Sequence, residues 1–133
     1  MTAAHGYSGT PLPRKLGITA TSRVLVLGGP PDFELGAEHH TRAGRPGYEV
    51  QLLFCPDVAT LCRRWPAAVT RSTERGAIWV AWLKKASGVP TDLTENGVRD
   101  HALPLGWVDV KVCAVDGMWS GLKLVRRRVP PSP

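Results

Sequence analysis

The sequence predicts a three-layer α/β domain built on an open, mostly parallel sheet of about five strands. Short apolar runs that end at glycine or proline indicate strands buried on both faces. Between these runs, apolar residues recur every three or four positions, which is the period of an amphipathic helix. The last two runs are joined by Asp116-Gly117, a pair typical of a hairpin turn.

The chain of 133 residues has the length of one domain, with 43% hydrophobic and 21% charged residues. This composition excludes a disordered chain. We divide it into an N-terminal arm (1–17), a single α/β domain (18–128) and a short C-terminal tail (129–133). Because Met1–Lys15 is rich in Gly, Pro, Ser and Thr, we expect it to be irregular, and it has no apolar stretch typical of a signal peptide.

The first half of the domain contains two buried-strand patterns. Ser22–Leu27 is a β-branched and leucine-rich run that stops at Gly28-Gly29-Pro30-Pro31, and Tyr48–Cys55 is a second run that ends at proline. Between them, the sequence allows one short helical piece near Asp32–Ala37 before further glycines and prolines interrupt it.

A helix and a third strand come next. Apolar residues at helical spacing run from Val58 to Val69, so this segment is predicted to be an amphipathic helix that ends at Gly76. Pro66 lies within the pattern and lacks the N–H that its turn needs, which predicts a kink or a helix in two pieces. Ala77–Leu83 is the most apolar strand pattern, but it is too short to span a membrane.

The loop Lys84–Thr91 leads into the last helix. Asp92 and Thr94 are both candidate N-caps, and Glu95 three residues after Asp92 has the spacing of a capping box. The helix is expected to end at Gly106.

Two strands close the domain. Trp107–Val115 alternates valines with Asp109 and Lys111, and Trp119–Val125 returns after the hairpin turn. Strands that alternate with helices imply right-handed crossovers and parallel pairing, and the hairpin adds one antiparallel strand. The order of elements therefore predicts a Rossmann-like open sheet.

The three cysteines, Cys55, Cys62 and Cys113, cannot all pair and form no C-x-x-C motif. We interpret them as buried, reduced thiols, which favours a cytoplasmic location. Cys62 with His39 and His40 matches no spacing known for metal ligands, so no metal site is predicted.

The net charge of +6 raises the question of a polyanionic partner. In the sequence the basic residues form small separate groups, and no membrane segment accompanies them. We therefore do not expect nucleic acid as the main partner, and a protein or a small anionic ligand is favoured. These groups are Arg14/Lys15, Arg63/Arg64, Lys84/Lys85 and Arg126–Arg128.

Ligands of open α/β sheets lie beyond the carboxyl ends of the strands. The candidate binding residues there follow the first and third strands, and they combine glycines with ammonium, hydroxyl and carboxylate groups near a helix N-terminus. Such a set would favour a phosphate or carboxylate, although capping alone also explains the last members. The set is Gly28, Gly29, Lys84, Lys85, Ser87, Thr91, Asp92 and Thr94.

Two aromatic residues are added as candidates. Tyr7, in the arm, could fold over the sheet and close a pocket, and Trp119, at the hairpin, is the candidate for an exposed and functional tryptophan. Trp79 and Trp82 have opposite parity on one strand, which places them in the cores on opposite faces. No general acid, base or nucleophile pair can be named, so catalytic residues stay unassigned.

Several segments resemble a short bacterial family that is described only as a domain of unknown function. They are Gly6–Leu12 (Gly-Tyr-Ser-Gly-Thr-Pro-Leu), Lys15–Ile18 (Lys-Leu-Gly-Ile), Lys84–Glu95 (Lys-Lys-Ala-Ser-Gly-Val-Pro-Thr-Asp-Leu-Thr-Glu) and Trp119–Lys123 (Trp-Ser-Gly-Leu-Lys). The resemblance covers nearly the whole chain and implies no activity.

The order of elements also resembles a truncated class I methyltransferase sheet, with Tyr48–Cys55 as that family's fourth strand. In that family, a glycine-rich turn after the first strand approaches S-adenosylmethionine (SAM). Here Pro30 and Pro31 supply no N–H donors at that turn, and no room remains for the strands that carry the ribose-binding carboxylate. No cofactor is therefore predicted.

Three functions follow as hypotheses. The favoured one is a non-catalytic, ligand-sensing or interaction module with a degenerate methyltransferase-like fold, because no catalytic group stands out. The second is a small enzyme or binder of an anionic metabolite or nucleotide. The third is a nucleic-acid accessory protein that uses Arg126–Arg128 and the lysine pairs.

Overall fold

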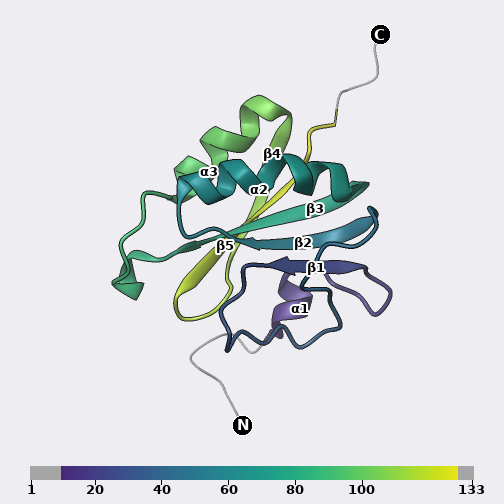
Figure 1. Ribbon diagram of the computed structural model, residues 1–133, viewed down its shortest axis with the longest axis horizontal. Helices are drawn as coiled ribbons and strands as arrows, with labels where there is room; N and C mark the ends of the chain where they lie inside the picture. Colours follow the sequence, from purple (N-terminus) through teal and green to yellow (C-terminus); the bar gives the residue numbers. More distant parts are fainter. Residues whose placement is uncertain (1–9, 129–133) are drawn as a thin grey trace.

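The computed structural model describes residues 10–128 and contains one five-stranded sheet in the order β1-β2-β3-β5-β4 (Figure 1). The first three strands are parallel, and β5 runs antiparallel to both β3 and β4. The predicted open sheet with a closing antiparallel hairpin is confirmed. The strands are β1 (Val24–Leu27), β2 (Tyr48–Phe54), β3 (Ser72–Leu83), β4 (Trp107–Ala114) and β5 (Trp119–Arg126).

Helices α2 (Val58–Arg71) and α3 (Glu95–Ala102) cover one face of the sheet (Figure 1). The other face carries α1 (Leu12–Lys15) and irregular chain. Short 3₁₀ turns at Lys85–Ser87 and Leu103–Leu105 complete the elements. No helix among residues 10–128 is both long and apolar enough to span a bilayer.

Two apolar cores lie on the two faces of the sheet, as strands buried on both sides require. Trp82 packs in the core under α2 and α3, and Trp79 packs in the opposite core, which confirms the parity argument. Trp65 of α2 and Trp107 of β4 meet edge to face, with ring centroids 5.3 Å apart. This contact holds α2 against β4, the edge strand beside β5.

The N-terminal arm is more ordered than predicted in its described part. Leu12–Lys15 forms α1 in place of irregular chain, and Leu16 is only 1% exposed. The indole Nε1 of Trp79 donates a hydrogen bond to the carbonyl oxygen of Leu16 over 3.2 Å. The apolar face of the sheet accounts for this order, because the β1–β2 connection contains no helix to cover it.

That connection contains no helix, so the helical piece predicted near Asp32–Ala37 is wrong. The segment instead runs along the open edge of β1, where His40 exchanges backbone hydrogen bonds with Val24 and Val26. Pairing with the edge strand satisfies backbone groups that a helix here would have left exposed on β1.

The end of α2 also differs from the prediction. The helix passes Pro66 as one element and ends at Arg71, and β3 begins at Ser72, so Gly76 lies inside a strand. A Cβ on Gly76 would lie 2.9 Å from the carbonyl oxygen of Tyr48 on β2. The glycine therefore permits a close approach of two strands and does not terminate a helix.

Candidate functional site

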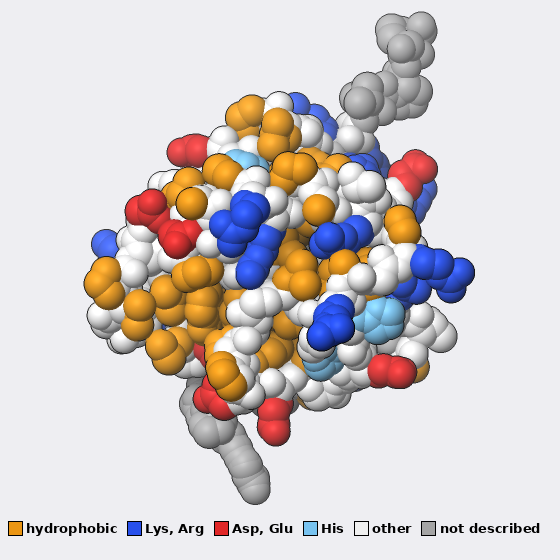
Figure 2. Space-filling model, viewed as in Figure 1, with side chains coloured by type: hydrophobic (Ala, Val, Ile, Leu, Met, Phe, Trp, Pro, Cys, Tyr) orange, Lys and Arg blue, Asp and Glu red, His pale blue; other side chains and the backbone are white. Residues whose placement is uncertain are grey.

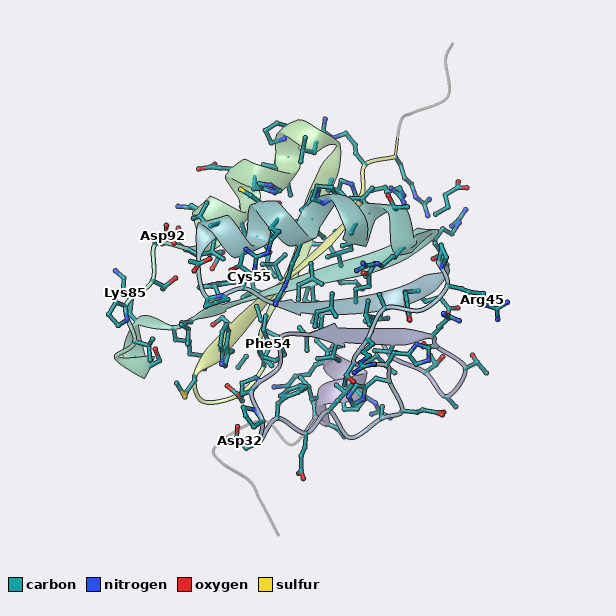
Figure 3. The ribbon with its side chains drawn as sticks, in the orientation of Figure 1. Asp32, Arg45, Phe54, Cys55, Lys85 and Asp92 are labelled. Atoms are coloured by element: carbon teal, nitrogen blue, oxygen red, sulfur yellow. The ribbon has the colours of Figure 1, made fainter. Side chains whose placement is uncertain are left out.

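Three segments follow the carboxyl ends of β1, β2 and β3, and we call them together the carboxyl rim: Gly28–Phe33, Pro56–Asp57 and Lys84–Thr94. Figure 3 shows Asp32, Cys55, Lys85 and Asp92 at this end of the sheet, with Arg45 at the opposite end. The fold thus brings the predicted binding residues after the first and third strands to one edge.

A hollow of about 460 Å³ opens in the carboxyl rim at the end of β3. Its apolar wall comes from Trp82, Leu83 and Leu93, and Val89, which is 42% exposed, lies at its border. Lys84 and Lys85 add positive charge. Figure 2 shows hydrophobic side chains gathered on the left of the molecule, where this end of the sheet lies.

Most of the candidate binding residues in this loop form hydrogen bonds that hold the loop in place. The ammonium of Lys84 donates to the carbonyl oxygen of Asp116 over 2.9 Å. The hydroxyl of Thr91 donates to the carbonyl oxygen of Pro56 over 2.6 Å, and Ser87 Oγ accepts from the amide of Val89 over 3.1 Å. Lys85 enters none of these contacts and is exposed. It is the cation of the loop best placed to meet a ligand.

Asp92 does not cap the helix that follows it. Its Oδ1 accepts a hydrogen bond over 2.9 Å from the amide of Val58, in the first turn of α2, where Asp57 caps the amide of Thr60. The cap of α3 is Thr94, whose Oγ1 accepts from the amide of Gly97 over 3.0 Å. The predicted capping box of Asp92 with Glu95 is therefore wrong, because α2 and this loop meet at the rim and offer Asp92 another amide.

Arg64 lies on α2 and reaches the carboxyl rim, and the sequence did not single it out as a candidate binding residue. Its Nη1 donates to the carbonyl oxygen of Phe54 over 2.5 Å, at the end of β2. A Cβ added to Gly28, whose φ is +75°, would overlap that same guanidinium. Arg64 therefore lies over the carboxyl ends of β1 and β2. In the sequence, the one sign of this role is that Arg64 lies next to the buried positions of the helix, which are Leu61, Trp65 and Ala68.

The titratable groups near Arg64 each keep one protonation state at neutral pH. Burial raises the pKa of the Cys55 thiol to about 12, and the positive charge of Arg64 opposes that rise only in part. The thiol thus stays protonated at neutral pH. Hydrogen bonds from Thr60 lower the pKa of Asp57, which stays ionised as the cap of α2.

The two aromatic candidates have different outcomes. Trp119 is 8% exposed and packs edge to face on Phe54, with ring centroids 5.0 Å apart, so the expectation of an exposed tryptophan is wrong. The hairpin turn folds back: Asp116 Oδ1 accepts from the amides of Met118 and Trp119, which turns the indole inward. Tyr7 and the tail 129–133 lie outside the described residues.

The cysteines and histidines form no metal site in the described part of the chain, where no three metal-ligating side chains gather. Cys55 is buried, Cys113 is half-buried and Cys62 is exposed on α2, so the prediction of buried thiols is wrong for Cys62. Its position on the solvent side of an amphipathic helix explains the difference.

Comparison with known proteins gives the fold. No family model and no curated protein matches this chain. Among solved structures, a complex of DhpI with SAH is similar over 88% of this chain and 82% of its own, with a TM-score of 0.60 and 9% identity. A putative type 11 methyltransferase from Sulfolobus solfataricus aligns over 71% of this chain and 62% of its own, with a TM-score of 0.48 and 13% identity. The domain has a methyltransferase-like fold.

Proposed function

We propose that this domain is a ligand-sensing module that binds a small anionic metabolite or nucleotide in the hollow at the end of β3. The observation that carries the proposal is the combination of an apolar wall with one exposed cation. Val89 and the accessible edge of Trp82 offer an apolar surface for a ring, and Lys85 offers a charge for a phosphate or carboxylate.

The module binds its ligand without changing it. A general acid, base or nucleophile must be free to exchange a proton or form a bond with the ligand. The Cys55 thiol is protonated, the Asp57 carboxylate accepts from the amide of Thr60, and the Lys84 ammonium donates to a backbone carbonyl. These three groups thus serve the structure of the domain and are not free for chemistry at the carboxyl rim.

The neighbour's SAH raises the question of a SAM-type cofactor at the turn after β1. The residues present do not fit it there. Arg64 lies over Gly28, and Pro30 and Pro31 carry no N–H to donate. The proposed ligand position is therefore the β3 side of the carboxyl rim.

A thermal-shift screen tests the proposal with SAH, ATP, AMP and phosphorylated sugars as separate probes. A probe at ten times its dissociation constant adds about 1.4 kcal/mol of stability, which is a measurable rise in melting temperature. For each probe that stabilises the protein, Val89→Asp places a negative charge at the border of the hollow and should abolish the shift. Val112→Asp, an equally exposed valine on β4, should leave it unchanged.

Lys85→Ala is the complementary variant, with Arg14→Ala on α1 as its charge-matched control. We expect the first to weaken binding by about tenfold and the second to have no effect. A stabilising probe that responds to neither Val89→Asp nor Lys85→Ala would place the site elsewhere. A probe recovered with altered bonds, as followed by mass spectrometry, would make the domain an enzyme.

A further inference from the structure

The edge of the sheet opposite the carboxyl rim is strongly basic. It is formed by the amino ends of β1, β2 and β3 and the carboxyl end of β5. We call it the amino edge. Figure 2 shows Lys and Arg side chains toward the right of the molecule, where this edge lies, and Figure 3 places Arg45 there. Its arginines are Arg23, Arg45, Arg71, Arg75, Arg126, Arg127 and Arg128, and its carboxylates are Glu49 and Glu74.

A trough runs along this edge. One hollow of about 490 Å³ is lined by Glu74, Arg75 and Val125–Arg128, and a second of about 540 Å³ is lined by Glu49 and Thr73–Arg75. The two share Glu74 and Arg75 and therefore adjoin each other, and we call the pair the trough. Among residues 10–128, Val125 is the only apolar residue that lines either hollow.

Some of these arginines stabilise the fold through contacts within the domain. Arg126 donates from Nη2 to the carbonyl oxygen of Val69 over 3.2 Å, and its guanidinium lies 4.7 Å from the ring centre of Trp107. Arg23 donates to the carbonyl oxygen of Arg45 over 2.7 Å. These contacts satisfy carbonyls near the end of α2 and in the β1–β2 connection.

The remaining arginines are not explained in this way. The side chains of Arg75, Arg127 and Arg128 are exposed and make no hydrogen bond or ion pair within residues 10–128. Gathering like charges at one edge costs electrostatic free energy in the isolated domain. At the carboxyl rim, the cations Lys84 and Lys85 are matched by Asp57 and Asp92. At the amino edge, seven arginines are accompanied by the two carboxylates of Glu49 and Glu74.

We propose that the trough at the amino edge binds nucleic acid through its phosphate backbone, without reading the base sequence. The exposed cations are all arginines, whose planar fork matches phosphate oxygens in pairs. A trough lined mainly by charged side chains favours a polyanion over insertion into a membrane. Trp107 is buried, and no aromatic side chain among residues 10–128 is exposed at this edge for base stacking, so backbone contact remains.

Of the small basic groups in the sequence, the fold places one, Arg126–Arg128, beside two arginines that formed no group. Arg71 and Arg75 lie at the start of β3, and Arg126–Arg128 lie at the end of β5, its antiparallel neighbour. The trough lies at the other end of the sheet from the ligand hollow. This inference therefore does not depend on the proposed function, and either can fail alone.

Fluorescence anisotropy with a short labelled DNA duplex of random sequence tests the inference over a series of salt concentrations. The logarithm of the binding constant should fall linearly with the logarithm of salt concentration, with a slope of about −3. In Arg75→Ala/Arg127→Ala, affinity at fixed salt should drop by about tenfold or more, and the slope should shrink by about 2. The control Arg14→Ala/Arg63→Ala removes the same charge elsewhere and should match the native protein.

Circular dichroism and melting temperature verify that both double variants are folded. The inference is overturned if the control pair weakens binding as much as the edge pair, because net charge alone would then explain the affinity. It is also overturned if binding is independent of salt. Equal affinity at the same salt for polyglutamate or for vesicles of anionic lipid would assign the trough to a different partner.

Discussion

At the scale of single residues, the contact between Arg64 and Gly28 decides what the turn after β1 can hold. The guanidinium is fixed by the carbonyl oxygen of Phe54 and lies where a side chain at position 28 would project. Gly28 also has a positive φ of +75°, which any other residue adopts at a cost. A glycine-rich turn that would otherwise be open to a ligand is thus covered by the protein's own side chain.

This contact predicts the effect of Gly28→Ala. The left-handed backbone costs about 1 kcal/mol for alanine, and displacement of the guanidinium adds about another 1 kcal/mol. We expect denaturant unfolding to show a loss of about 2 kcal/mol. In the Arg64→Ala background the same substitution should cost only the backbone part, so a strictly additive cycle would contradict the contact.

The cysteines give a second prediction at this scale. Burial holds the pKa of Cys55 at about 12, so about one thiol in ten thousand is ionised at pH 8. Burial also raises the pKa of Cys113, whereas Cys62 is exposed. Titration of the native protein with a thiol reagent should therefore show one fast phase. Cys62→Ser should remove it, and a fast phase that survives would show that another thiol is reactive.

At the scale of elements, the loop Lys84–Thr94 and the start of α2 stabilise each other. Asp92 accepts from the amide of Val58, and Thr91 donates to the carbonyl oxygen of Pro56. Two carboxylates, Asp57 and Asp92, therefore face the positive end of the α2 dipole. This helix N-terminus is occupied by the protein's own anions, which is why the proposed ligand lies on the Lys85 side of the loop.

We expect Asp92→Ala to destabilise the domain by about 1 kcal/mol, because it removes a helix cap. Hydrogen exchange should report the loss at the first turn of α2, in particular at Val58, and not at the first turn of α3. Asp100→Ala, on the exposed side of α3, serves as the control and should change stability by less than about 0.5 kcal/mol. Faster exchange confined to α3 would indicate that Asp92 caps α3, as in the predicted capping box, and would contradict its contact with Val58.

At the scale of the whole molecule, the sheet is covered unequally. Two helices cover one face, and α1 with irregular chain covers the other. Leu16 reaches into that second core, next to the backbone contact with Trp79. The segment before β1 therefore belongs to the folded domain and is not an appendage to it.

This predicts that Leu16→Ala costs about 2–5 kcal/mol, as is usual for a fully buried leucine. The combined emission of the five tryptophans should shift to longer wavelength as water reaches the indole of Trp79. Leu12→Ala is the matched control in the same segment, and its half-buried position predicts a loss of about 1 kcal/mol. Equal and small losses from both variants would mean that the arm is dispensable.

The order of the strands and of the two main helices along the chain could be predicted, because the signal for each element is local. Apolar periodicity places Val58–Val69 on a helix and Trp79 and Trp82 on opposite faces of a strand, whatever lies around them. The errors occurred where a contact distant in sequence prevailed. The sequence suggests that Gly76 ends a helix, but the residue is needed because β2 passes close beside it. The sequence offers Trp119 as a candidate for exposure, but Phe54 packs against its ring.

The sequence by itself determined the alternation of strands and helices, the hairpin and the carboxyl rim that holds the loop Lys84–Thr94, because residue period and turn chemistry act between near neighbours. Only the tertiary structure decided that Asp92 caps α2, that Arg64 lies over Gly28, and that the arginines around Arg75 and Arg127 share one edge. Each of these joins segments far apart in the chain. Packing of helices on the sheet sets such distances, and no local pattern encodes them.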